Sequence, residues 1–212
     1  MPVEPHPVCR YVAEPPQESL PDGRWATTLE RHFLGACDGL DEEGEDLGEP
    51  GDVAFHPDRT WHGRTYVPAT AQTSTGYELF GYVSFRPGGE DREPSEFDAV
   101  ADFTAATAAE NPDWELDLCE EVVGVWRGEP GETADMTLVW GRPLVQGGAV
   151  VVAELADLAV DECALVDERF TLLAPDRYAG GTLSVKLLDA AGEEIARESL
   201  YEDDGEDEDE DE

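Results

Sequence analysis

Two groups of side chains in this sequence have the types and spacing of metal ligands. The first consists of two short His/Cys pairs separated by a longer segment, and its members are His6, Cys9, His32 and Cys37. Imidazole and thiolate groups in such pairs are the ligands of tetrahedral zinc sites. The pairs depart from the usual zinc patterns, which join cysteine to cysteine and histidine to histidine. Zinc is one hypothesis, and the alternative is a surface histidine in a proline-rich segment with unrelated cysteines.

The second group combines two histidines with two carboxylates, and its members are Asp52, His56, Asp58 and His62. Mixed ligands of this kind suit a metal ion that assists hydrolysis. One hypothesis is therefore a metal-dependent enzyme that uses His56 and His62 with the nearby carboxylates. The alternative is structural: Pro57 and Asp58 form a type I turn, in which proline is favoured at the second position. His62 then lies on an exposed strand face.

Other signatures of enzymes are absent from the sequence. It contains no glycine-rich nucleotide-binding motif, no G-x-S-x-G and no H-E-x-x-H. Four histidines and a single lysine, Lys186, leave few groups that titrate near neutral pH for general acid–base catalysis. We therefore expect a protein that is not an enzyme and has no cofactor, apart from the zinc hypothesis.

The net charge of −38 comes from 51 acidic and 13 basic residues. Residues 38–52 and 202–212 hold nearly half of this excess, and no stretch is basic. Direct binding to nucleic acids or anionic membranes is disfavoured, because both depend on Lys and Arg contacts with phosphates. The acidity serves either solubility or the attraction of a basic protein, including one whose nucleic-acid site this chain occupies as a mimic of phosphates.

If a basic partner exists, the acidic loop at residues 38–52 is predicted to contact it more than the tail does. The loop is tethered at both ends, so its charges lose less entropy on binding. The predicted contacts are Asp41, Glu42, Glu43, Glu45 and Asp46. A third hypothesis is an accessory protein of a larger assembly, with exposed aromatic residues such as Trp61 and Tyr66 as its contacts.

The hydrophobic pattern predicts an α+β fold that is mostly antiparallel sheet, either a sandwich or one curved sheet. One main helix is predicted near residues 95–110, with Ser95 as its N-cap and Pro112 beyond its end. Residues 24–34 fit both periodicities and are assigned to a strand because of their paired threonines. Further strands are predicted at residues 60–67, 77–86, 114–127 (with a bulge near Glu120), 135–142, 148–156, 164–173, 182–189 and 194–201.

Four segments are predicted: a proline-rich arm at 1–23, an α+β lobe at 24–127, an antiparallel lobe at 128–201 and a disordered acidic tail at 202–212. The two lobes are either separate or parts of one domain. We expect a cytoplasmic protein, because the longest apolar run is far shorter than the roughly 18–20 residues of a membrane helix. The start of the chain also lacks the features of a secretory signal. The cysteines, which include Cys119 and Cys163, are then free thiols.

Overall fold

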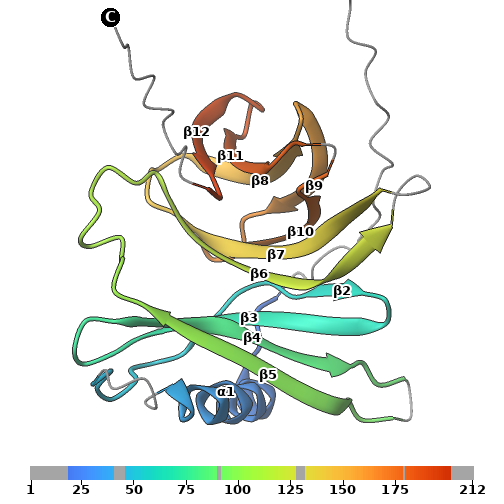
Figure 1. Cartoon of the computed structure of the whole chain (residues 1–212). Coiled ribbons are helices and arrows are strands. Elements are labelled where there is room, and N and C mark those ends of the chain that lie inside the picture. Colours follow the sequence, from blue (N-terminus) through green and yellow to red (C-terminus); the bar gives the residue numbers. More distant parts are fainter. Residues whose placement is uncertain (1–18, 41–45, 90–91, 128–131, 179, 202–212) are drawn as a thin grey trace, which may run out of the picture.

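Figure 1 shows the computed structural model, which describes residues 19–40, 46–89, 92–127, 132–178 and 180–201. In this part of the chain, one helix and three antiparallel sheets are stacked in four layers. The expectation of a mostly antiparallel protein with a single helix is confirmed. Most of the predicted arm and the whole predicted tail, 202–212, lie outside the described residues.

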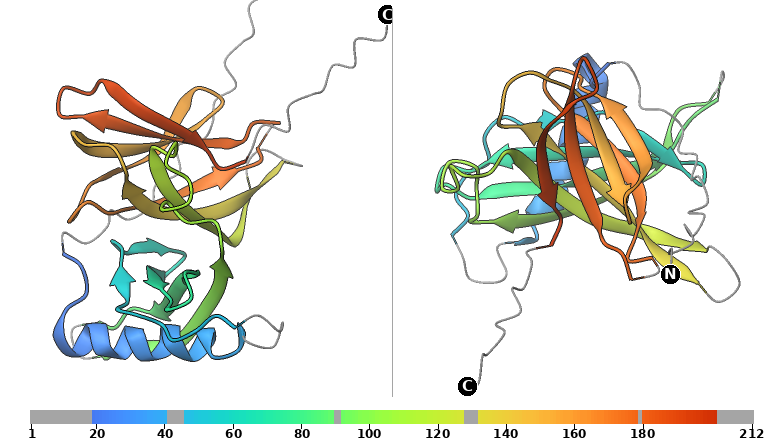
Figure 2. Two further views of the ribbon diagram at one scale, coloured as in Figure 1. Left: turned by 90° about the vertical axis from the view of Figure 1, so that its left-hand side faces the viewer. Right: turned by 90° about the horizontal axis from the view of Figure 1, so that it is seen from above.

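The base sheet has five strands and carries the helix on one face. Its strands are β1 (Ala54–Phe55), β2 (Arg59–Trp61), β3 (Arg64–Gln72), β4 (Glu78–Arg86) and β5 (Ser95–Thr104). The helix α1 (Gly23–Cys37) lies beneath this sheet (Figure 2). Leu29 and Phe33 are fully buried between α1 and the sheet, where they contact a cluster that includes Val67 and Val83.

The middle sheet lies on the opposite face of the base sheet. Its strands are β6 (Leu116–Arg127), β7 (Thr133–Pro143) and β10 (Phe170–Asp176), in the order β10-β7-β6. Tyr66 and Tyr82 of the base sheet pack against Met136, Leu138 and Trp140 of β7. Because its other face is also covered, β7 is buried continuously from Met136 to Gly141. Such two-sided burial is typical of a central strand.

The outer sheet completes the stack. Its strands are β8 (Gly148–Leu155), β9 (Leu158–Ala164), β11 (Leu183–Asp189) and β12 (Glu194–Ser199), in the order β12-β11-β8-β9. Val151, Val185 and Leu187 of this sheet are fully buried against a cluster that includes Val139 and Phe170 of the middle sheet. The predicted boundary between residues 127 and 128 falls between β6 and β7, which pair along their length.

The predicted helix near 95–110 is wrong, and so is the predicted strand at 24–34. Residues 95–104 form β5, which pairs with β4 along its length. Phe97 and Phe103 face α1, whereas Val100 faces the middle sheet, so the apolar residues of β5 serve two faces rather than one helical stripe. In α1 the helical spacing of Leu29 and Phe33 prevails, because both side chains reach the base sheet.

Two strand predictions also require correction in their extent. The strand expected at residues 60–67 is divided between β2 and β3 by a turn at His62 and Gly63, and β3 continues through Pro68 to Gln72. The strand expected at 164–173 is divided between the end of β9 and β10, with a turn between them. The bulge predicted near Glu120 is present as a register shift between Val122 and Gly124.

Candidate binding cleft

The first group of predicted metal ligands is only partly described. His6 and Cys9 lie outside the described residues. His32 stacks on Phe97 with the ring centroids 4.7 Å apart, whereas Cys37 is buried at the end of α1. Residues five positions apart on a helix differ by about 140° around its axis, so the two side chains leave α1 in different directions.

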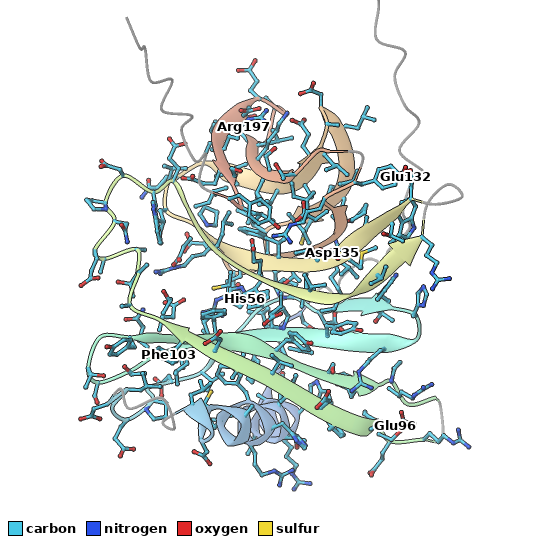
Figure 3. All side chains as sticks on the ribbon, in the orientation of Figure 1. His56, Glu96, Phe103, Glu132, Asp135 and Arg197 are labelled. Carbon is cyan, nitrogen blue, oxygen red and sulfur yellow. The ribbon has the colours of Figure 1, made fainter. Side chains whose placement is uncertain are left out.

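The second group is spread along the chain around β2. His56 is 3% exposed and lies between the base and middle sheets (Figure 3), whereas His62 is exposed in the turn after β2. Asp52 is also exposed, and Asp58 is half-buried. Among the described residues, no group of three or more His, Cys, Asp or Glu side chains is placed to hold a metal ion.

His56 is nevertheless unusual, because neither ring nitrogen has a hydrogen-bond partner among the described residues. Burial and the nearby positive charge of Arg169 lower its pKa to about 3. The carbonyl groups of Gly141 and Phe170 oppose this shift, although neither accepts a hydrogen bond of normal geometry. The imidazole is therefore neutral at physiological pH.

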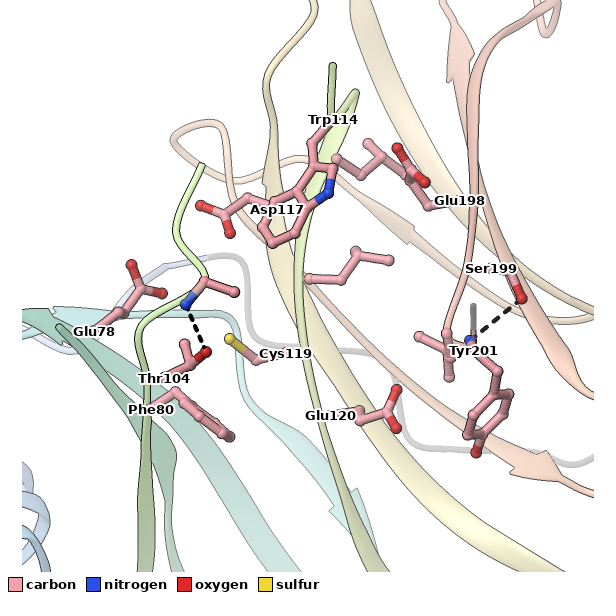
Figure 4. Close-up of a pocket in the computed structure, with 14 residues that line it drawn as sticks. Glu78, Phe80, Thr104, Trp114, Asp117, Cys119, Glu120, Glu198, Ser199 and Tyr201 are labelled. Atoms are coloured by element: carbon pink, nitrogen blue, oxygen red, sulfur yellow. Dashed lines mark hydrogen bonds between the residues drawn. The ribbon is translucent and has the colours of Figure 1, made fainter. Parts of the chain in front are cut away.

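A cleft in the described part of the chain has a volume of about 540 Å³. It opens where the ends of β4, β5, β6 and β12 meet (Figure 4). Its lining combines four carboxylates with three aromatic rings: Glu78, Asp117, Glu120 and Glu198, with Phe80, Trp114 and Tyr201. This combination suits a cation, because carboxylates attract positive charge and aromatic faces bind it through their quadrupole.

Glu120 is the least compensated carboxylate of the cleft. It is half-buried, and it has no hydrogen bond or ion pair with another described residue. Burial raises its pKa to about 7, the negative charge of Asp176 adds to the shift, and Arg177 opposes it. A positive group in the cleft would favour the ionised form of Glu120 and so oppose the shift.

Glu78 and Asp117 form a second pair of acidic side chains, on the wall of the cleft opposite Glu120. Glu78 accepts a hydrogen bond of 2.7 Å from Nε2 of Gln72, and Asp117 accepts one of 3.0 Å from Nε of Arg142. Burial and the charge of Asp117 raise the pKa of Glu78. Both residues also line a neighbouring cavity of about 320 Å³, which contains His56.

Tyr201 is fixed at the other end of the cleft. Its hydroxyl group donates a hydrogen bond to Oδ2 of Asp176, and the guanidinium carbon of Arg177 lies 4.9 Å from the ring centroid. Asp176 is itself 1% exposed and accepts a hydrogen bond of 2.9 Å from the backbone of Leu183. Burial and the bond to Asp176 raise the pKa of Tyr201 to about 12. Its phenol is thus neutral, and these contacts fix its ring as one side of the cleft.

The cleft also contains the thiol of Cys119. Burial and the surrounding carboxylates raise its pKa well above the ordinary value, so the thiol stays protonated and is a poor nucleophile. Cys37, Cys119 and Cys163 are all free thiols, as expected.

Of the five predicted partner-binding residues, the structure describes Asp46. Asp41, Glu42, Glu43 and Glu45 lie outside the described residues. Asp46 accepts a hydrogen bond from the backbone of Gly48 and is absent from the lining. Sequence reasoning missed the cleft carboxylates because they belong to three different sheets and resemble the many other acidic residues. The one available signal was the bulge expected near Glu120, since bulges redirect side chains.

The aromatic contacts of the accessory-protein hypothesis are not exposed. Tyr66 is 6% exposed and lies against the ring of Tyr82, with the centroids 5.5 Å apart. Trp61 is half-buried, and its ring covers the backbone of Gly124 so closely that a Cβ there would lie 2.3 Å from it. Both rings are part of the contact between the base and middle sheets.

Comparison of the chain with protein-family models, curated proteins and solved structures found no match. The single helix of the described residues is not long and apolar enough to cross a membrane.

Proposed function

We propose that this chain is a non-enzymatic binding protein whose partner places a positively charged group in the cleft between β4, β6 and β12. The observation that carries the proposal is Glu120, a half-buried carboxylate whose pKa stays raised because Arg177 offsets burial and the charge of Asp176 only in part. An unpaired buried charge costs free energy, and a cation from a partner would remove this cost.

Apart from Glu120, whose pKa is about 7, the neighbouring titratable groups offer little acid–base chemistry near neutral pH. The thiol of Cys119 has a raised pKa and the imidazole of His56 has a lowered one, so neither exchanges a proton readily near neutral pH. The three aromatic rings of the cleft add cation–π attraction of about 0.5–2 kcal/mol at each contact.

The charge of the whole chain supports a basic protein as the partner. A net charge of −38 attracts cations over a Debye length, about 8 Å at physiological salt, and accelerates their encounter. A nucleic-acid-binding protein fits this description, with the acidic surface in place of phosphates. We place the interaction in the cytoplasm, where the free thiols of Cys37, Cys119 and Cys163 stay reduced.

The proposal can be tested with a lysine octapeptide as the probe and a glutamine octapeptide as the neutral control. The substitution Glu120→Gln should weaken lysine-peptide binding about three- to tenfold. The matched control is Glu162→Gln, because Glu162 is an exposed strand carboxylate at the opposite edge of the outer sheet. Both variants retain the acidic loop and tail, so the contributions of those segments cancel. Equal effects of the two substitutions would contradict the cleft as the binding site.

A further inference from the structure

The cleft runs along the edges of two strands rather than over the face of a sheet. β6 is the last strand of the middle sheet, and β12 is the last strand of the outer sheet. Residues 116–120 and 198–201 are two consecutive runs, and every residue in them lines the cleft. Successive side chains of a strand point to opposite faces, so only an opening along the strand edge is lined by all of them.

The hydrogen bonds to β7 fix which peptide groups of β6 face this opening. The amide of Leu144 donates to the carbonyl of Glu115 across 2.9 Å. In an antiparallel ladder, bonded residues alternate with residues whose peptide groups point away. With the register of Asp117 opposite Arg142, the N–H and C=O groups of Leu118 and Glu120 therefore point away from β7.

The same reasoning applies to β12. The amide of Leu200 donates to the carbonyl of Leu183 across 3.4 Å. Ser199 is opposite Ser184 in this ladder, so its peptide group points away from β11. Unpaired strand edges of this kind are templates for the addition of another strand.

The two edges lie side by side and run in the same direction. At one end the backbone N–H of Glu115 donates to Oε1 of Glu198 across 3.0 Å. At the other end the negative charge of Glu120 contributes to the raised pKa of Tyr201. Between these points the cleft separates the strands. Figure 4 shows Glu120 on the side of β6 that faces Tyr201, whereas Cys119 points to the other side, towards Thr104 and Phe80.

We propose that an extended basic segment of a partner protein enters this cleft as an additional strand, which pairs with the open edge of β6 and lies beside the edge of β12. This inference rests on the proposed function and specifies its partner. Backbone hydrogen bonds give affinity in strand addition, and alternate side chains give specificity. Successive side chains of the added strand face opposite walls of the cleft, with Glu78 and Asp117 on one wall and Glu120 on the other. Lys or Arg at alternate positions therefore meets carboxylates on either wall.

Charge complementarity selects a foreign strand over one from this chain. Residues 1–18 contain three glutamates and one arginine, and residues 202–212 contain ten acids and no base. Either segment would place negative groups next to Glu120 and Glu198. A second copy of the chain carries the same acidic edges and is disfavoured for the same reason.

The test uses two peptides of eight residues that alternate lysine and valine, both with acetylated and amidated ends. One of them is N-methylated at every second residue, on the edge that would face β6. The two have equal charge, but the methylated peptide lacks the N–H donors along that edge and cannot use it to pair with β6. We expect the methylated peptide to bind at least about tenfold more weakly, because each lost hydrogen bond contributes on the order of 1 kcal/mol.

Amide hydrogen exchange gives a second readout that does not depend on a protein variant. Binding of the unmodified peptide should slow exchange at Leu118 and Glu120 by about tenfold or more. The amide of Val139, which is buried inside the middle sheet, serves as an internal control and should not change.

The outcomes separate this inference from the proposed function. If both peptides bind equally and exchange at Leu118 and Glu120 is unchanged, strand addition is wrong while cation binding stands. If neither peptide binds and the lysine octapeptide also fails, the proposed function is wrong. Binding of the unmodified peptide alone, with protection of the two amides, supports both.

Discussion

Nη2 of Arg59 in β2 donates a hydrogen bond of 2.6 Å to Oδ2 of Asp161 in β9 and so connects the base sheet to the outer sheet. The same guanidinium donates from Nε to the carbonyl of Thr171 in the middle sheet across 3.0 Å. Arg59 is 2% exposed. A single side chain therefore joins all three sheets, and Oδ2 of Asp161 also accepts a hydrogen bond from the backbone of Leu173.

Substitution of Arg59 by methionine should destabilise the protein by about 3–5 kcal/mol. The reason is that Asp161 would remain buried without its partner, which costs more than the ion pair itself contributes. Chemical unfolding in guanidinium chloride measures the change. The control is Arg86→Met, because the pair of Arg86 and Glu96 is 61% exposed on both sides and should contribute less than about 1 kcal/mol. Similar losses for the two variants would contradict a structural role for the buried pair.

Glu120 should make the native state less stable as pH rises. Its pKa is about 7 in the folded protein and 4.5 as the ordinary value, so the native state binds more protons than the unfolded state between these limits. The stabilisation is present below pH 4.5 and is lost as pH rises through 7. At pH 8, Glu120→Gln should therefore raise the free energy of unfolding by on the order of 1 kcal/mol after solvent screening.

Thermal unfolding at pH 4.5 and pH 8 tests this dependence. A gain of about 2–4 °C is expected for a change of 1 kcal/mol in a chain of this size, and it should appear at the higher pH alone. Glu162→Gln provides the comparison. A gain of equal size at both pH values would show that Glu120 does not titrate in this range.

Binding of a basic peptide should become tighter as pH rises from 6 to 8. The cation binds the ionised form of Glu120, whose population grows as pH passes its pKa of about 7. Calorimetric titration in two buffers of different ionisation enthalpy should detect proton release on binding at pH 7. In Glu120→Gln this release should be absent, and its persistence would assign the proton to another group.

His56 should have the opposite effect on stability. Its pKa is about 3 in the folded protein against 6.5 as the ordinary value, so the unfolded state takes up a proton first as pH falls. The stabilisation is complete above pH 6.5 and is lost as pH falls towards 3. His56→Leu also removes two unpaired buried nitrogens. In this variant the free energy of unfolding should fall less steeply as pH falls from 6.5 towards 3. An unchanged slope would show that the imidazole is accessible to protons in the native state.

The melting temperature should rise with added salt. A net charge of −38 destabilises the compact state through repulsion, and salt screens this repulsion until the Debye length falls to about 3 Å near 1 M. Sodium chloride and potassium chloride should act alike, because the effect is one of ionic strength. A melting temperature that stays flat over this range would contradict repulsion as a significant cost.

Sequence patterns predicted the strands that turns delimit on both sides. β4 matches the strand predicted at residues 77–86, and β11 and β12 match those predicted at 182–189 and 194–201. The predictions failed where one set of residues fits two periods. Leu29 and Phe33 are compatible with a helix and with a strand, and the base sheet that decides between them is distant in sequence. β5 was mistaken for a helix because its apolar residues face two layers.

The cleft was beyond sequence reasoning for a related reason. Glu78, Glu120 and Glu198 lie on three different sheets, and the stacking of the sheets alone brings them together. Nothing local distinguishes these residues from the other acids of the chain. Glu78 and Glu120 share a burial that raises their pKa values, and this burial depends on the assembled fold.

The order of the layers has a consequence for synthesis on the ribosome. α1 and all strands of the base sheet precede residue 105, so this unit can form while the rest of the chain is still being made. The face of the base sheet that carries Tyr66 and Tyr82 then remains exposed to solvent until β6 and β7 are synthesised. The middle sheet is completed by β10, which follows β8 and β9 of the outer sheet. The middle and outer sheets must therefore complete their folding together. Until they do, the aromatic surface of the base sheet stays uncovered in the nascent protein.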